Sequence, residues 1–362
     1  MSTLETIKEE IKKYEPDFWK KLNINRTFIR EHPLKKMVND LEDKESIGVS
    51  EKSYSLKLAD SIVYAKNEHE DFFKKKWKIV VQTGDDYNNP VGTCGEFRAL
   101  HILEQSGFCV SQILEGKNET PDFSVTDRYG NEFYIEVFTP RMKLEARKKL
   151  KSFKESNISS TNENELPRSS IVTYRPWSEA SRKHILCERC KRVLGNKITG
   201  SQAKTDGVNI LWINFENGDL KLNKKDLFPH VSDVYKDIYH TGSFGIWQVF
   251  YGKKSTKFFD ELTWLKYYHR MHNTIAEEDG VFRQGSKWSG VIFNLDKCQT
   301  FFQNPWSENK IKKETLESIV RMNSFDLESS WLDIEEEELI KRIDCKIREC
   351  QMVHELLENL ES

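Results

Sequence analysis

One stretch in the first half of the chain, residues 119–140, constrains the fold more than any other. Its sequence, ETPDFSVTDRYGNEFYIEVFTP, has two runs of aromatic and β-branched residues around the turn-forming segment DRYGN. Such residues favour strands, and Gly130 can adopt the positive φ that a tight turn requires. The pattern predicts a β-hairpin whose second strand is apolar on both faces and therefore lies inside a sheet.

Two carboxylates interrupt this hairpin. Glu136 lies in the middle of the apolar second strand, and Asp122 lies at the start of the first. A carboxylate in an apolar strand is costly to desolvate unless cations or hydrogen-bond donors compensate it. Two acids on adjacent strand ends can hold a hard divalent cation through their oxygens. The hairpin therefore indicates a metal site at one end of the sheet.

These residues resemble the motif of the PD-(D/E)XK nuclease superfamily, which has the restriction-endonuclease-like fold. Pro121 and Asp122 match the PD, and Glu136 matches the acid of the second half of the motif. The resemblance implies an α/β fold with a mixed sheet flanked by helices. It also implies hydrolysis of phosphodiester bonds with Mg²⁺ or Mn²⁺, in which Asp122 and Glu136 bind the metal, and it is compatible with a role in anti-phage defence or restriction.

The segment before the hairpin follows the order of elements in that family. The sequence predicts a helix over residues 93–106, ended by Gly107, and then a strand over residues 108–114. Many family members carry a further metal ligand on the first helix, so the resemblance makes Glu96 a candidate. The alternative is that an acid in the first turn stabilises the helix dipole.

Phe138 stands where the family usually has its lysine, and this departure leaves two hypotheses open. In the first, the protein cuts nucleic acid, and Lys197, Lys143 or Arg141 supplies the missing positive charge. We favour Lys197 slightly over Lys143, because Pro140 ends the strand and directs the following chain away from the sheet. In the second, the fold has lost catalysis and binds nucleic acid or a protein partner.

Two basic segments, residues 141–154 and 168–197, follow the hairpin, although the whole chain has a net charge of −2. Clustered cations beside aromatic residues suit phosphate contacts and base stacking, whereas charge runs also occur on solvated helix faces. The expected partner is nucleic acid, with DNA favoured over RNA. The candidate contact residues are Arg141, Arg147, Lys148, Arg175, Arg182 and Gln202.

A third hypothesis is a zinc-dependent interaction module built on His184, Cys187 and Cys190. These residues fall inside a predicted helix, and the sequence has no second CxxC or CxxH to complete a tetrahedral set. A P-loop, a GxGxxG and a GxSxG motif are also missing from the sequence. Nucleotide-dependent motors and serine hydrolases therefore have no sequence support.

The chain divides into a helical N-terminal region, residues 1–76, a core, residues 77–300, and a helical acidic tail, residues 301–362. The coiled-coil-like seam of the tail docks on its own domain or joins two copies in a homodimer. Besides the strands named above, the sequence predicts strands over residues 77–81, 208–215, 245–251 and 289–295.

The sequence predicts a cytoplasmic protein without membrane contact. No apolar run approaches the length of a membrane span, and the N-terminus lacks the apolar core of a signal peptide. The seven scattered cysteines are an odd number, which fits reduced thiols better than a disulfide framework.

Overall fold

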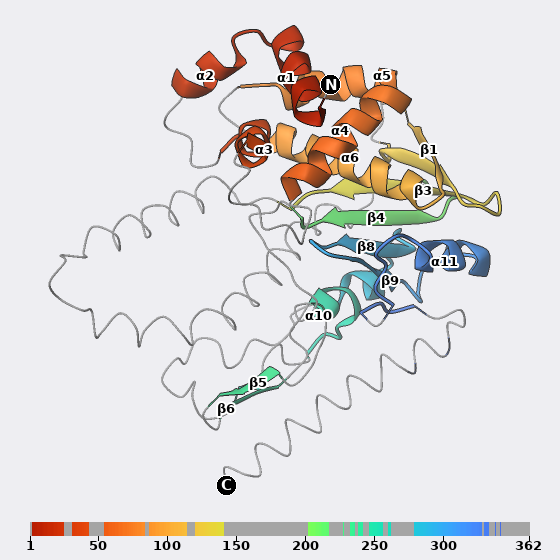
Figure 1. Ribbon diagram of the computed structural model, residues 1–362. Helices are drawn as coiled ribbons and strands as arrows, with labels where there is room; N and C mark the ends of the chain where they lie inside the picture. The colour runs from red at the N-terminus through yellow and green to blue at the C-terminus, as the bar shows by residue number, and fades with distance from the viewer. Residues whose placement is uncertain are drawn as a thin grey trace, which may run out of the picture.

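A six-stranded mixed sheet runs through the computed structural model of the protein, with the strand order β1-β2-β3-β4-β8-β9 (Figure 1). The structure describes residues 2–24, 31–42, 54–83, 87–113, 120–140, 202–216, 227, 232–235, 238–241, 246–255, 260–261, 279–327, 329–332, 337 and 341. The strands are β1 (Cys109–Gln112), β2 (Phe123–Thr126), β3 (Glu132–Phe138), β4 (Asn209–Asn214), β8 (Gly290–Asn294) and β9 (Gln299–Gln303).

The pairing within this sheet is mixed. The pairs β1–β2, β2–β3 and β8–β9 are antiparallel, whereas β3–β4 and β4–β8 are parallel. The coarse expectation of an α/β protein with a mixed sheet is therefore confirmed. A smaller sheet has the order β5-β6-β7, and its strands are β5 (Ser232–Tyr235), β6 (Ile238–Thr241) and β7 (Asp260–Glu261).

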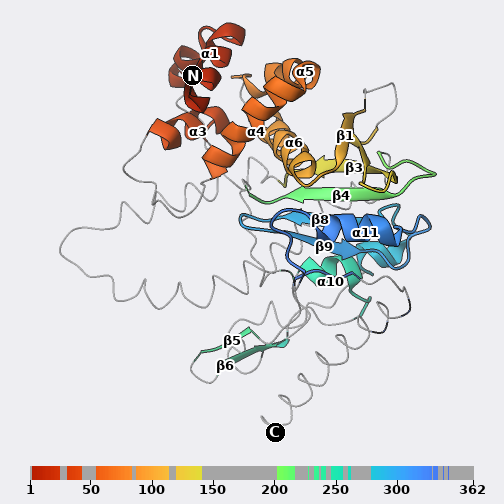
Figure 2. The same ribbon diagram turned by 45° about the vertical axis from the view of Figure 1, so that its right-hand side comes forward.

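Helices cover both faces of the large sheet (Figure 2). The N-terminal group is α1 (Thr3–Tyr14), α2 (Phe18–Ile24), α3 (Pro33–Glu42), α4 (Tyr54–Glu68), α5 (Glu70–Val80) and α6 (Asn88–Gln105). The later helices are α10 (Ile246–Tyr251), the 3₁₀ helix η3 (Val281–Gln284) and α11 (Lys313–Val320). Among the described residues, no helix is both long and apolar enough to cross a membrane.

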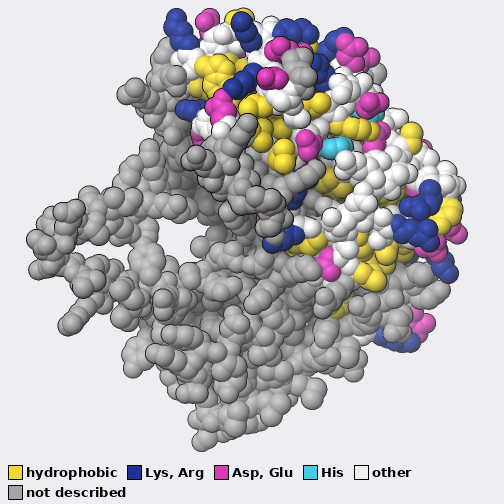
Figure 3. Space-filling model, in the orientation of Figure 1, with side chains coloured by type: hydrophobic (Ala, Val, Ile, Leu, Met, Phe, Trp, Pro, Cys, Tyr) yellow, Lys and Arg dark blue, Asp and Glu magenta, His cyan; other side chains and the backbone are white. Residues whose placement is uncertain are grey.

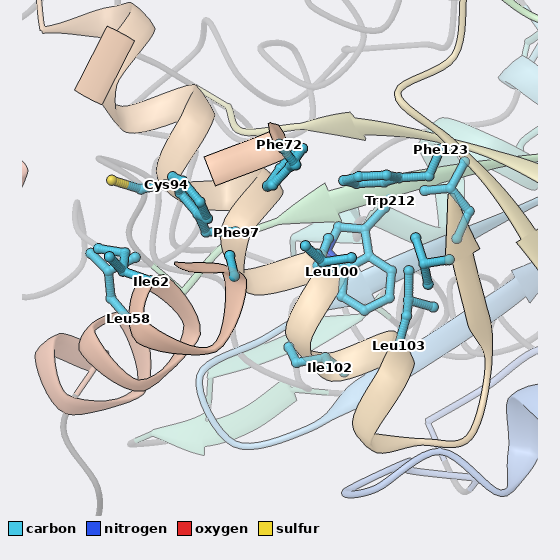
Figure 4. Close-up of a cluster of buried hydrophobic side chains, with 14 of the residues drawn as sticks. Leu58, Ile62, Phe72, Cys94, Phe97, Leu100, Ile102, Leu103, Phe123 and Trp212 are labelled. Carbon is cyan, nitrogen blue, oxygen red and sulfur yellow. The ribbon is translucent and has the colours of Figure 1, made fainter. Parts of the chain in front are cut away.

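Strand alternation divides the hydrophobic residues between two cores. In β4, Ile210 and Trp212 belong to the core under the N-terminal helices, whereas Leu211 and Ile213 belong to the core that contains α10 and η3. This is the two-residue period of a strand that is buried on both faces. Figure 4 shows side chains of the first core, which come from α4, α5, α6, β2 and β4.

Local sequence signals explain where α1 begins, where α6 ends and where the β2–β3 turn lies. The hydroxyl of Ser2 accepts a hydrogen bond from the Glu5 amide, while the Glu5 carboxylate accepts one from the Ser2 amide, which forms a capping box at the start of α1. Gly107 follows α6 with a φ of 87°, and Gly130 lies in the β2–β3 turn with a φ of 83°. Both glycines adopt the positive φ that the sequence predicts for them.

Two predicted strands are wrong. Residues 77–80 form the last turn of α5 and Val81 caps it, because Phe73, Trp77 and Val80 complete its buried helical stripe. Residues 246–251 form α10, in which Trp247, Phe250 and their apolar neighbours pack into the second core. A short apolar run fits a strand or a buried helix equally well, and tertiary packing selects between them. The strand β9 is not among the predicted elements.

Candidate site at the carboxyl end of β3

Asp122 and Glu136 lie at the same end of the β2–β3 hairpin. The antiparallel register pairs Phe123 with Ile135, so one further step along both strands places Asp122 opposite Glu136. Oδ2 of Asp122 accepts a hydrogen bond of 2.8 Å from the amide of Val137, the residue after Glu136. This bond turns the Asp122 carboxylate toward β3, so both acids lie at the same end of the hairpin.

Glu136 is enclosed by the protein, with only 3% of its surface exposed. Its neighbours Ile135 and Val137 pack into the core under the N-terminal helices. Because side chains alternate along a strand, Glu136 projects from the other face of β3, which also carries Phe138. Phe138 is half-buried and packs against the second core, so β3 itself supplies no cation beside Glu136.

Helix α6 approaches the sheet closely at the same end. A Cβ atom on Gly95 would lie 2.3 Å from Oγ1 of Thr139, which follows β3, and 3.1 Å from Nδ2 of Asn214, which ends β4. Real Cβ atoms do not approach other atoms so closely, so this contact requires a glycine. The position of Gly95 fixes the early turns of α6 over the carboxyl ends of β3 and β4.

Glu96 follows Gly95 and therefore lies near this end as well. It forms an ion pair with Lys76 of α5, and only 14% of the Glu96 side chain is exposed. Because α6 begins at Asn88 rather than at residue 93, Glu96 lies in the third turn. A helix dipole acts mainly on the first turn, so the dipole explanation for this acid is wrong.

The carboxylates of Asp122, Glu136 and Glu96 lie at this end, but they do not form a three-residue metal site. Among the described residues, no group of three His, Cys, Asp or Glu side chains is arranged to hold a metal ion. Helix α6 covers the face of β3 that carries Ile135, so Glu96 approaches the carboxyl end of β3 from the helix side of the sheet. The pair Asp122 and Glu136 still fits Mg²⁺ or Mn²⁺, because Mg²⁺ commonly binds one or two carboxylates and completes its shell with water and phosphate oxygens.

All of the predicted cationic contacts lie outside the described residues. These are Lys143, Lys197, Arg141, Arg147, Lys148, Arg175 and Arg182, together with the three members of the proposed zinc site, His184, Cys187 and Cys190. Gln202 is half-buried in the turn that precedes β4. The residues of the predicted seam, Ile340, Ile343, Ile347, Cys350, His354 and Leu357, lie outside the described residues, so the homodimer stays a prediction.

Lys76 is the residue of this end that sequence reasoning missed, since the predictions place no chemistry in residues 1–76. It is 6% exposed and is the one lysine among the described residues to be buried. The sequence does contain a signal, because Lys76 interrupts the helical stripe formed by Phe72, Phe73, Trp77 and Val80. A charge in the buried stripe of an amphipathic helix needs a partner.

A second polar feature lies on the opposite flank of α6. Nε and Nη2 of Arg98 each donate to one carboxylate oxygen of Glu216, both at 2.8 Å, at the wall of a cavity of about 250 Å³. Lys57 and Asp296 also line this cavity, and Lys57 donates a hydrogen bond to the backbone carbonyl of Asp296. Acids and bases neutralise one another here, which is typical of a structural ion-pair network.

Acidic and basic side chains are interspersed over the N-terminal helices on the face shown in Figure 3. The visible charge pattern therefore does not point to one class of partner. Comparisons of the chain with models of protein families, with curated proteins and with solved structures found no significant match. Any function has to be inferred from the residues of the site and from the fold that positions them.

Proposed function

We propose that the protein is a metal-dependent nuclease that hydrolyses phosphodiester bonds, with Asp122 and Glu136 as its metal-binding acids. The observation that carries this proposal is the convergence of the two carboxylates where β2 and β3 meet. Glu136 is buried between the apolar residues Ile135 and Val137 of β3, where a bound cation would compensate the cost of its desolvation.

The order of the elements supports a restriction-endonuclease-like fold. Helix α6, the antiparallel strands β1, β2 and β3, and then β4 parallel to β3 follow one another along the chain. The PD-(D/E)XK resemblance implies the same order for the helix and the first three strands. It also places the two acids at the start of the second strand and within the third, which are the positions of Asp122 and Glu136.

The chain's own residues would orient the ligands and exclude water. The Val137 amide holds one oxygen of Asp122, which fixes the direction of that carboxylate before a ligand binds. Glu136 is shielded from solvent, so electrostatic interactions at its carboxylate are stronger than they would be in water. When bound, Mg²⁺ or Mn²⁺ would lower the pKa of a water molecule and stabilise negative charge on a phosphate.

The proposed substrate is nucleic acid, with DNA favoured over RNA. The two basic segments after the hairpin supply the candidate phosphate contacts. If they neutralise phosphates, the logarithm of the binding constant falls with the logarithm of salt concentration, with a slope of about 0.9 for each phosphate contacted on duplex DNA. Binding that does not change between low and physiological salt would contradict this part of the proposal.

A second candidate function is binding without cleavage, and Phe138 is the observation that favours it. This residue occupies the position of the family's lysine and packs against the second core. In this alternative, the protein binds nucleic acid or a protein partner on its surface and performs no hydrolysis. Binding of nucleic acid that is independent of divalent metal, with no cleavage of any substrate, would support it.

The deciding experiment incubates the purified protein with plasmid, single-stranded DNA and RNA, each with Mg²⁺, Mn²⁺ or a chelator. We expect cleavage with metal, and we expect Asp122→Asn and Glu136→Gln to remove it. Glu132→Gln is the matched control, because Glu132 is an exposed acid at the far end of the same strand. Wild-type protein that cleaves none of the three substrates would overturn the proposal.

A further inference from the structure

The ion pair between Lys76 of α5 and Glu96 of α6 is buried between the two helices. Lys76 lies in the apolar stripe of α5 and is 6% exposed. Burial of an ammonium group is costly, and replacing a buried ion pair by apolar residues often costs a protein no stability. The location of the pair within the fold therefore indicates what it does.

Three aromatic rings locate this ion pair relative to the carboxylate site. The ring of Phe72 on α5 lies 5.3 Å from that of Phe97 on α6 and 5.8 Å from that of Phe123 on β2, measured between centroids. Figure 4 shows the three rings gathered between the two helices and the sheet. Lys76 comes one helical turn after the first ring, while Glu96 and Asp122 directly precede the other two rings.

The three charged residues lie on the same side of this aromatic cluster. Asp122 lies toward the carboxyl end of β3, because it is opposite Glu136 in the antiparallel register. Glu96 lies toward that end, because its neighbour Gly95 abuts Thr139. Lys76 is paired with Glu96 and so lies on that side too.

We infer that Lys76 supplies the positive charge that Phe138 cannot supply, and that Glu96 holds its amine at the carboxyl end of β3. The group that it would face is the phosphate of a bound nucleic acid. This inference rests on the proposed nuclease function and adds one residue to it. It also gives the buried ion pair a role, since Glu96 orients the ammonium group before the substrate binds.

The role of Lys76 in hydrolysis is electrostatic. The oxygen of a water molecule forms a bond to phosphorus, the bond from phosphorus to the leaving oxygen breaks, and the proton of the water ends on the leaving oxygen. Lys76 transfers no proton in this scheme. Its fixed charge stabilises the negative charge that develops on the phosphate, and a preorganised charge is most effective in a site shielded from bulk solvent.

The test compares kcat and KM of the wild type, Lys76→Met and Lys78→Met on a substrate that the wild type cleaves. Methionine resembles the stem of lysine as far as Cε and lacks the amine, and Lys78 is an exposed lysine on the same helix. We expect Lys76→Met to lower kcat about 100-fold, with KM changed less than about threefold, because the charge acts mainly in the transition state. Lys78→Met should match the wild type.

Two further measurements separate a catalytic charge from a structural one. Added methylammonium should restore part of kcat in Lys76→Met but not in Glu136→Gln, since only the first variant lacks a cation. The double variant Lys76→Met/Glu96→Gln removes both charges and avoids a buried carboxylate without its partner. We expect it to fold, as checked by thermal unfolding, to cleave slowly and to respond to methylammonium.

The inference fails if folded Lys76→Met retains the wild-type kcat, or if the double variant regains it. Either result would make the ion pair purely structural while leaving the proposed nuclease function intact. A wild-type protein that cleaves no substrate would instead overturn the nuclease function, and this inference with it. The two failures are distinguished by the activity of the wild type alone.

Discussion

The amide of Val137 donates a hydrogen bond of 2.8 Å to Oδ2 of Asp122, across the end of the β2–β3 hairpin. A side-chain carboxylate here occupies the place of a backbone carbonyl in the strand ladder. Asp122 is thus held by the strand that carries Glu136, and the separation of the two carboxylates is set by sheet geometry. Opposed residues of an antiparallel pair have Cβ atoms about 4.5–5.5 Å apart, a span that one cation can bridge.

Divalent metal should therefore stabilise the folded protein. A ligand that binds only the native state raises its stability, by about 2.7 kcal/mol at a concentration 100 times the Kd. We expect Mn²⁺ to raise the Tm of the wild type but not that of Asp122→Asn, in which the amide oxygen can still accept from Val137. The Glu132→Gln control should respond as the wild type does. Equal shifts in all three proteins would mean that the metal binds elsewhere.

Gly95→Ala should destabilise the protein. In an ordinary helix interior this substitution stabilises by about 0.5–1 kcal/mol, so the sign of the effect is diagnostic. Here the added Cβ would collide with Oγ1 of Thr139, and overpacking of this kind typically costs about 1–3 kcal/mol. Denaturant unfolding measures the change, and Gly95→Ala combined with Thr139→Ala should recover part of it. An increase in stability in the single variant would show that α6 does not contact the sheet as described.

Arg98→Met should cost about 3–5 kcal/mol, because it removes the two-bond partner of the buried Glu216 carboxylate, and the Lys57 amine, 4.0 Å away, compensates that charge only in part. Only 8% of the Arg98 side chain and 2% of the Glu216 side chain are exposed. The variant Arg98→Met/Glu216→Leu replaces both charges by apolar groups and should regain most of the loss. The free energies of unfolding of Arg98→Met, Glu216→Leu and the double variant together form a double-mutant cycle. Additive losses would mean that the two residues do not interact.

Acid should weaken the contact between the β2–β3 turn and α11. Burial would raise the pKa of Asp127, but hydrogen bonds from the Thr315 hydroxyl and from Asn131 outweigh it and hold the pKa below the ordinary value of 3.8. A carboxylate with a lowered pKa contributes its full stability above pH 3.8, and that contribution disappears as the pH falls through the folded-state pKa.

Thr315→Val tests this contact. It removes a hydrogen bond to a charged group, worth about 1.5–3 kcal/mol, so the variant should be less stable than the wild type at pH 7. It should also lose less stability than the wild type on acidification to pH values below 3.8, as measured by urea unfolding. Parallel pH profiles of the two proteins would contradict the coupling between Asp127 and Thr315.

The hairpin and its two acids follow from the sequence alone because every signal involved is local. Strand-forming residues on both sides of Gly130 define the turn, and the apolar residues around Glu136 indicate that its strand is buried. The register that brings Asp122 opposite Glu136 is set by this short turn. The strands β1, β4 and β8 carry similarly strong local patterns and were predictable for the same reason.

Tertiary structure decided what local patterns leave open. Residues 77–80 and 246–251 carry short apolar runs that suit a strand or a helix, and packing against the rest of the core made helices of both. The pairing of Lys76 with Glu96 joins two helices, and the contact of Gly95 with Thr139 joins a helix to a strand. Such contacts depend on how elements distant in sequence pack together. A local sequence pattern does not indicate which residue of another element a buried charged side chain will contact.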